Sequence, residues 1–164
     1  MFKHILIATD GSELASKAVT TGLELAKALA AEITFVAVTE PRTHLVPAPV
    51  SLPPVLTEDD EALRQAAETV LANARADGAK LNVVCKSVHV ANAFPAEAIL
   101  KEAQARGCDV IVMASHGRRG LARLVLGGET LRVVTNSAIP VLVCRSVSTS
   151  KNQAETSIRR RTLR

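Results

Sequence analysis

Residues 109–145 have the sequence DVIVMASHGRRGLARLVLGGETLRVVTNSAIPVLVCR, the most informative stretch of the chain. An apolar run at 110–114 ends at a small and basic loop, 115–120. A glycine pair at 127–128 precedes a helical pattern, and a second apolar run follows at 141–144. In α/β proteins this arrangement binds anions, because glycines admit backbone N–H groups to a phosphate and a helix N-terminus adds partial positive charge. The stretch predicts a phosphate-bearing ligand.

The rest of the chain alternates apolar runs with helical periodicity. Residues 40–56 hold five of the seven prolines and are therefore expected to be neither helix nor central strand. Asp10 or Ser12 is expected to cap the first helix, and Gly78 to end the second. We predict strands at residues 4–9, 32–39, 81–90, 109–114 and 141–145, and helices at about 15–29, 57–78, 95–107 and 128–137.

This alternation predicts an α/β fold with an open, five-stranded parallel sheet and helices on both faces, a Rossmann-like architecture. The strands are near-continuous apolar runs, as expected of strands that are buried on both faces. Ligands in such sheets bind beyond the carboxyl ends of the strands, where the strand order reverses. The groups expected there follow the first, second and fourth strands, namely residues 9–11, 38–40 and 114–117.

Length and charge divide the chain into one domain and a tail. The 164 residues, 48% of them hydrophobic, suit a single domain over residues 1–146. Residues 145–164 hold six basic residues and one acidic residue. Their net positive charge is larger than the +4 of the whole chain, so the residues before 145 carry a slightly negative net charge. We expect the polar segment 147–164 to be a disordered, solvated extension. Contact of this tail with nucleic acid or an acidic membrane is the less favoured alternative.

Composition also limits the classes of function. Three Phe with no Tyr or Trp argue against base stacking, so no specific nucleic-acid partner is expected. Cys85, Cys108 and Cys144 show neither a CxxC motif nor metal-ligand spacing, which suits a reducing compartment and predicts no metal site. Because no apolar run has the length of a membrane-spanning helix, we expect a cytoplasmic protein without a membrane contact.

The turn after the first strand offers a carboxylate instead of a common phosphate fingerprint. Neither GxxxxGK[ST] nor GxGxxG is present. At a strand end that faces a cleft, Asp10 is placed to accept hydrogen bonds from a ribose hydroxyl or an adenine amino group. The alternative, that Asp10 only caps the first helix, is about equally supported.

Three segments carry a resemblance to a known family. They are KHILIATDGSELASKAV at 3–19, VMASHGRRGLARLVLGGETLRVV at 112–134 and IPVLV at 139–143. Through them, residues 2–146 resemble the universal stress proteins. ATP-binding members of that family carry the pattern G-x-x-G-x₉-G-[S/T].

The pattern is present here with two departures. Gly117 and Gly127 match its second and third glycines, whereas Ala114 replaces the first glycine and Gly128 replaces the final Ser or Thr. The missing hydroxyl would remove one phosphate hydrogen bond, worth about 1.5–3 kcal/mol, or a tenfold to hundredfold loss of affinity. Thr130 offers a substitute hydroxyl.

The resemblance implies the strand order 3-2-1-4-5 and a site for ATP or another adenine nucleotide, with or without Mg²⁺. Asp10 would hold the adenosine part, and Val38 would meet adenine through its backbone. Glu129 would add repulsion if it points inward. The predicted ligand-binding set, with Met113 and Ala114 as the floor and His116, Gly117, Gly127 and Gly128 toward the ribose and phosphates, is Ala8, Thr9, Asp10, Val38, Met113, Ala114, His116, Gly117, Gly127, Gly128 and Glu129.

The last strand predicts an assembly. Val141, Leu142 and Val143 would form an apolar edge, which proteins normally protect. Pairing with a second copy protects it and generates a two-fold homodimer, as the resemblance also implies; the alternative is that the tail covers the edge.

The function that we favour from the sequence is an adenine-nucleotide-binding sensor or modulator of the stress response. The alternative is a stress protein that acts only through a protein partner, without a nucleotide. An enzyme, at most a weak ATPase, is less favoured, because the matched loops show no evident base, lysine clamp or second carboxylate. We therefore predict no catalytic residue. Arg118 and Arg119 are interpreted as a solvated loop rather than a polyphosphate clamp.

Overall fold

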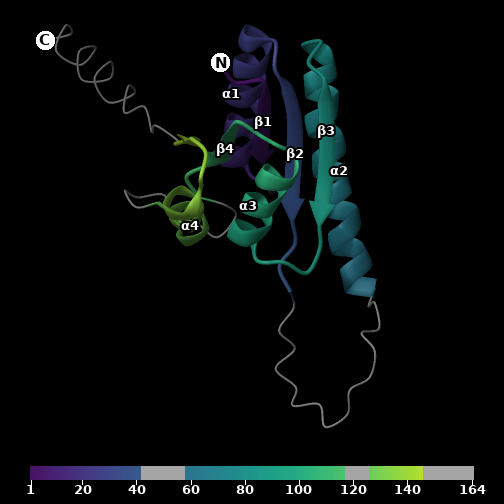
Figure 1. Ribbon diagram of the computed structural model, residues 1–164. Coiled ribbons are helices and arrows are strands. Elements are labelled where there is room, and N and C mark those ends of the chain that lie inside the picture. The colour runs from purple at the N-terminus through teal and green to yellow at the C-terminus, as the bar shows by residue number, and fades with distance from the viewer. Residues whose placement is uncertain (42–57, 117–125, 146–164) are drawn as a thin grey trace, which may run out of the picture.

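Strands and helices alternate along the chain, as their periodicities require (Figure 1). The computed structural model describes residues 1–41, 58–116 and 126–145. Its elements are β1 (His4–Ala8), α1 (Glu13–Leu29), β2 (Glu32–Val38), α2 (Glu58–Lys80), β3 (Cys85–Val90), α3 (Pro95–Ala105), β4 (Val110–Ala114), α4 (Gly128–Asn136) and β5 (Val141–Cys144).

The strands form one parallel sheet in the order β3-β2-β1-β4-β5. In the centre, Ile5 of β1 is in register with Ile33 of β2 on one side and Val110 of β4 on the other. The α/β fold predicted from the sequence and the strand order implied by the resemblance are therefore confirmed. The order reverses between β1 and β4, where the carboxyl ends of neighbouring strands lead to opposite halves of the sheet.

Two apolar clusters cover the two faces of the sheet. Alternate residues of β1 point to opposite sides, so Ile5 and Ile7 pack with α1 and α2, while Leu6 packs against α3 and α4. Phe35 in the first cluster and Met113 in the second come from β2 and β4. Burial on both faces explains why these strands are almost continuously apolar.

The boundary between α2 and β3 differs from the prediction. We expected Gly78 to end the helix and a strand to start at 81, but α2 continues to Lys80 and β3 begins at Cys85. A Cβ at Gly78 would overlap the Sγ of Cys85, so the glycine permits close packing of helix on strand instead of ending the helix. Asn82, with φ of 56°, makes the turn between them.

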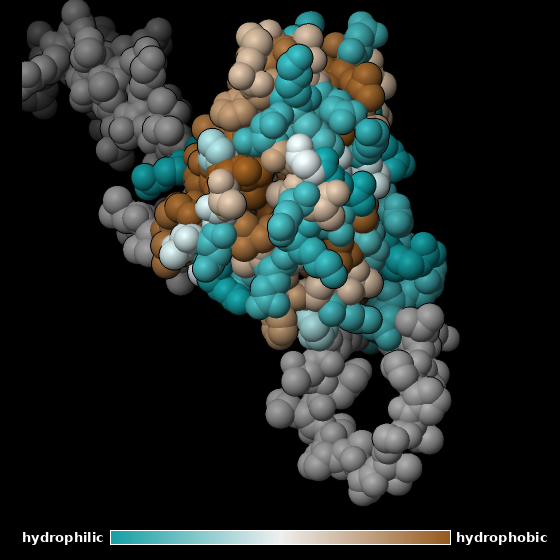
Figure 2. All heavy atoms as spheres, viewed as in Figure 1, coloured by the Kyte–Doolittle hydropathy of each residue, from teal (hydrophilic) through white to brown (hydrophobic). Residues whose placement is uncertain are grey.

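The surface formed by α4 and β5 is partly apolar. Figure 2 shows apolar side chains gathered on the side of the molecule where these elements lie. Leu131 and Val134 of α4 are 52% and 40% exposed, and Leu142 of β5 is 39% exposed. In the part of the chain that the structure describes, no helix has the length and apolar character needed to cross a membrane.

Candidate functional site

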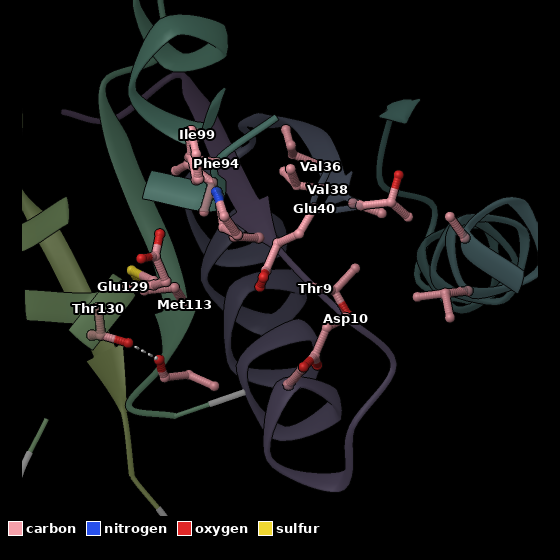
Figure 3. Close-up of a pocket in the computed structure, with 18 of the residues that line it drawn as sticks. Thr9, Asp10, Val36, Val38, Glu40, Phe94, Ile99, Met113, Glu129 and Thr130 are labelled. Carbon is pink, nitrogen blue, oxygen red and sulfur yellow. Dashed lines mark hydrogen bonds between the residues drawn. The ribbon is translucent and has the colours of Figure 1, made fainter. Parts of the chain in front are cut away.

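A cavity of about 850 Å³ lies at the carboxyl ends of β1, β2 and β4, where the strand order reverses (Figure 3). This volume lies within the range of small-molecule sites, roughly 300–1,000 Å³. Residues of α2, the start of α3 and the start of α4 complete its walls. The cavity is therefore at the place where open α/β sheets bind ligands.

The structure brings the predicted site residues together around this cavity. Gly117 lies outside the described residues, as do Arg118 and Arg119. The remaining predicted residues all line the cavity, and they are Ala8, Thr9, Asp10, Val38, Met113, Ala114, His116, Gly127, Gly128 and Glu129. Their individual contacts with a nucleotide remain predictions.

Hydrogen bonds shape the loop after β1. The Asp10 Oδ1 accepts from the backbone N–H of Ser12 at 3.0 Å, and the Ser12 hydroxyl oxygen accepts from Ala15 N at 3.2 Å. Ser12 is thus the N-cap of α1. Asp10 therefore does not cap the helix itself: its carboxylate holds Ser12 through that residue's N–H, and it also lines the cavity.

Gly127 permits a close approach between the start of α4 and the end of β4. Its N–H donates to the Ser115 carbonyl at 2.9 Å, and a Cβ there would lie 3.2 Å from the same oxygen. The first hydrogen bond of α4 runs from the N–H of Leu131 to the carbonyl oxygen of Gly127. The N–H of Gly127 therefore donates to another part of the protein, and those of Gly128, Glu129 and Thr130 precede the first hydrogen bond of the helix.

The two residues that flank Glu129 differ in what they can offer a ligand. Gly128 has space beside it, since no atom of the described residues lies within 4 Å of a Cβ built on it. Thr130 is 3% exposed, and its hydroxyl donates to the Ala114 carbonyl at 3.0 Å. The hypothesis that Thr130 replaces the missing Ser or Thr hydroxyl is therefore corrected: this hydroxyl ties α4 to β4.

Glu129 joins two helices at the edge of the cavity. Its Oε2 accepts from the backbone N–H of Ala96 at 2.7 Å, and its Oε1 lies 3.3 Å from Arg132 Nη1. The N-cap of α3 is Phe94, which offers no side-chain hydrogen bond. Glu129 therefore supplies, from α4, a hydrogen-bond acceptor at the start of α3.

The charged side chains among the described lining residues are the carboxylates of Asp10, Glu40 and Glu129. Figure 3 shows Asp10 and Glu40 in the loops after neighbouring strands, β1 and β2, and Glu129 at the start of α4. His116 is part-buried, and its Nδ1 lies 3.2 Å from the Ser115 hydroxyl. In the described ranges, no group of three or more metal-ligating side chains comes together.

Sequence reasoning missed the apolar walls of the site. Phe94, the N-cap of α3, is 57% exposed and lines the cavity together with Ile99 of α3. Leu63 and Val70 line it from α2. The helical positions fitted a purely structural core face, so periodicity gave no reason to assign them to a ligand. Only the position of Phe94, directly before a helix-starting proline, offered a signal.

The fold and the cavity define a Rossmann-like α/β protein with a ligand site at the reversal of its strand order. The chain belongs to the universal stress protein family, whose family model (Usp) matches residues 1–145.

Three known proteins each match 88% of the chain. Universal stress protein YxiE of Bacillus subtilis (strain 168) is 31% identical over 152 residues, covering 88% of this chain and 100% of the relative. The solved structure of universal stress protein UspA from Lactobacillus plantarum matches with a TM-score of 0.77 at 25% identity, covering 88% of this chain and 98% of that one. A universal stress protein from Archaeoglobus fulgidus in complex with dAMP shares the fold, with a TM-score of 0.64 at 15% identity and coverage of 88% and 98%.

Proposed function

We propose that this universal stress protein binds an adenine nucleotide, such as ATP or AMP, and acts as a sensor or modulator of the stress response. The observation that carries the proposal is the convergence of the predicted residues on one cavity at the strand-order reversal. The family relationship and the dAMP complex of the Archaeoglobus fulgidus protein support the same class of ligand.

The residues present fit the parts of such a ligand. Val38, Met113 and Ile99 give the cavity apolar walls suited to a purine, and Asp10 places a carboxylate suited to a ribose hydroxyl. At the start of α4, the N–H groups of Gly128 and Glu129 suit a phosphate. A Mg²⁺ ion bound with the nucleotide would draw ligands from its phosphates.

Calorimetric titration of the full chain with AMP and ATP tests the proposal. We expect micromolar binding that Asp10→Asn weakens at least about tenfold, because one charge-assisted hydrogen bond is worth about 1.5–3 kcal/mol. Asparagine keeps an oxygen that can accept from Ser12 N, so the variant retains the loop. Glu13→Gln, on the exposed first turn of α1, is the matched control. No binding at millimolar nucleotide would reject the proposal.

The second candidate is a stress protein that acts through a protein partner without a nucleotide. The observation in its favour is the loss of phosphate-directed groups, since residue 128 has no hydroxyl and that of Thr130 bonds to Ala114. We favour binding over catalysis in either case. Nucleotide hydrolysis above the buffer background in single-turnover assays would contradict a purely binding role.

We further propose a cytoplasmic homodimer formed through Val141, Leu142 and Val143 of β5. This strand is the edge of the sheet, and its Leu142 is 39% exposed beside the apolar surface of α4. Sedimentation should give a dimer for the wild type and a monomer for Leu142→Lys. Val84→Lys, at a position that is 65% exposed beside β3, should remain dimeric. A monomeric wild type would reject this assembly.

A further inference from the structure

We infer that the cavity prefers an adenine nucleotide with one phosphate group to a triphosphate, and that Glu129 sets this preference. The inference rests on the nucleotide-binding function proposed above and goes beyond it by naming the subclass of ligand. It depends on two properties of the start of α4, namely the donors that it has left for a ligand and the charge beside them.

The first property is a shortage of donors. The N–H of Gly127 donates to the Ser115 carbonyl, and the hydroxyl of Thr130 donates to the Ala114 carbonyl. Residue 128 is a glycine without a hydroxyl. The N–H groups of Gly128, Glu129 and Thr130, which precede the first hydrogen bond of α4, are enough to bind the oxygens of one phosphate group. A triphosphate has further charged oxygens, which need donors that the described start of α4 does not supply.

The second property is a fixed negative charge. Arg132 lies 2.9 Å from Glu97 Oε1 and 3.3 Å from Glu129 Oε1, so one guanidinium is shared by two carboxylates and the group keeps a net negative charge. The bond from Ala96 N at 2.7 Å holds the Glu129 carboxylate at the cavity wall. The Glu129 side chain therefore cannot turn away from a ligand without breaking this hydrogen bond and leaving the start of α3 without its cap.

Among the described residues that line the cavity, there is no lysine or arginine side chain to offset this charge. A phosphate monoester carries about −1.5 to −2 charges at pH 7, and each further phosphate adds to this. Repulsion between like charges several ångströms apart at a protein surface changes affinity by about three- to tenfold per carboxylate.

Titrations of the full chain with AMP, ADP and ATP, each with and without Mg²⁺, test the inference. We expect AMP to bind at least about tenfold more tightly than ATP. Glu129→Gln keeps an oxygen that can accept from Ala96 N but removes the negative charge. It should therefore reduce the ratio of AMP affinity to ATP affinity about three- to tenfold, mainly by strengthening the binding of ATP. Glu13→Gln is the matched control, because it also removes one carboxylate, but Glu13 pairs with Lys17 and does not line the cavity, so it should leave the ratio unchanged.

A second measurement needs no variant. Salt screens repulsion between ligand and wall, so the wild-type affinities for AMP and ATP should converge as the salt concentration rises. A ratio that is independent of salt, or unchanged by Glu129→Gln, would overturn the role of Glu129. Binding of ATP as tight as that of AMP would overturn the preference but leave the proposed nucleotide-binding function in place. Absence of binding by all three nucleotides would instead reject that function.

Discussion

The carboxylate of Glu129 in α4 accepts a hydrogen bond from the backbone N–H of Ala96 in α3, with 2.7 Å between Oε2 and N. Phe94, the N-cap of α3, provides no side-chain acceptor of its own. One helix thus caps its neighbour across a separation of 33 residues in sequence. Since both helix starts line the cavity, the contact links the stability of the fold to the shape of the site.

Removal of this cap should destabilise the protein. We expect Glu129→Ala to lower the free energy of unfolding by about 1–2 kcal/mol, because an unmet backbone donor at a helix start costs about this much. Urea denaturation measures the effect. Glu97→Ala removes a carboxylate from the same arginine, but its side chain is 65% exposed, so a change within about 0.5 kcal/mol is expected. Equal losses in the two variants would show that the cap contributes nothing.

Gly128→Ser should strengthen nucleotide binding. A Cβ at this position meets no atom within 4 Å among the residues that the structure describes, so serine fits against them without displacement. The added hydroxyl would donate to a phosphate oxygen, for a gain of about tenfold or more in affinity. Calorimetric titration beside Gly128→Ala separates the hydroxyl from the Cβ. If the Gly128→Ser and Gly128→Ala variants bind the nucleotide with the same affinity, the hydroxyl at residue 128 does not reach the ligand.

Gly78→Ala should destabilise the fold, although alanine is the better helix former. Its Cβ would overlap the Sγ of Cys85 and lie 3.3 Å from Cδ2 of Leu23, so α2 must move away from the sheet. Overpacking of this kind costs about 1–3 kcal/mol. Gly128→Ala adds a Cβ that meets no described atom within 4 Å at the start of a helix, so it should be neutral or slightly stabilising in the same denaturation assay. A more stable Gly78→Ala variant would contradict the packing argument.

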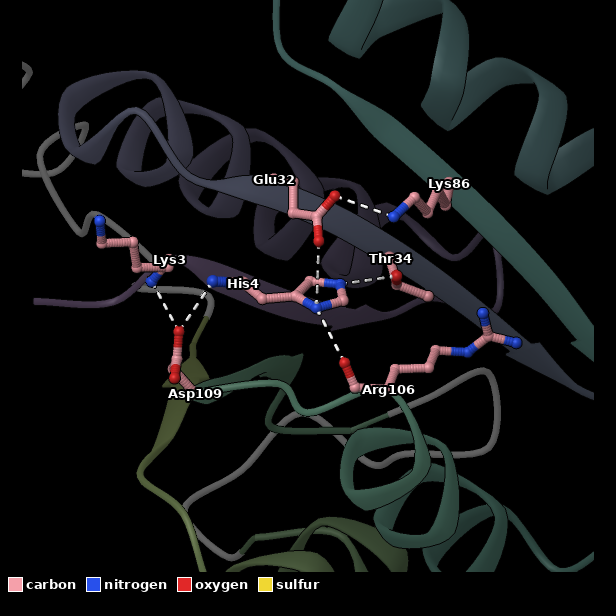
Figure 4. Close-up of polar contacts among 7 residues, drawn as sticks. All are labelled: Lys3, His4, Glu32, Thr34, Lys86, Arg106 and Asp109. Atoms are coloured by element: carbon pink, nitrogen blue, oxygen red, sulfur yellow. Dashed lines mark hydrogen bonds and ion pairs between the residues drawn. The ribbon is translucent and has the colours of Figure 1, made fainter.

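Asp109 should make stability depend on pH. Figure 4 shows its carboxylate accepting from the backbone N–H groups of Lys3 and His4, at 2.6 and 2.9 Å. These bonds lower the pKa of the Asp109 carboxyl below its ordinary value. A carboxyl with a lowered folded-state pKa stabilises the fold above its unfolded-state pKa, about 3.9, and this contribution is lost as the pH falls through the folded-state value.

Comparison of wild type and Asp109→Asn by denaturation at several pH values tests this. The variant should be less stable at pH 7. The difference should shrink as the pH falls below about 4 toward the lowered folded-state pKa, below which the Asp109 carboxyl is neutral in the folded protein too. Asp77→Asn alters an exposed helical pair with Lys80 and should change stability by less than about 1 kcal/mol at every pH. A wild-type advantage that persists at acidic pH would assign the effect to geometry instead of charge.

Local patterns predicted most of the fold. The apolar runs at β1, β2 and β4 and the periodicity of α1 and α3 reflect burial on defined faces, a property that each segment carries by itself. Predictions were less accurate at glycines, because a glycine either ends a helix or permits close packing, and the sequence alone does not distinguish the two. Gly78 marks a close contact, whereas Gly107, with φ of 62°, follows the end of α3 in the left-handed conformation that favours glycine.

The candidate site was predictable in position but not in chemistry. In a parallel sheet, loops after neighbouring strands meet at one edge, so Asp10, Val38 and Met113 could be assigned to one site from their places in the sequence. The contributions of α2 and the start of α3 depend on how helices pack across the sheet. No periodic pattern in the sequence distinguishes those lining residues from ordinary core.

By itself, the sequence determined the types of the elements, the family resemblance and the glycine-bearing start of α4, because strand period, helix period and turn chemistry act over a few residues. Only the tertiary structure decided which polar groups remain for a ligand. The bonds from Thr130 to Ala114 and from Ala96 to Glu129 join residues that are 16 and 33 positions apart. Such bonds form only when packing brings distant segments within about 3 Å, a distance that no local pattern encodes.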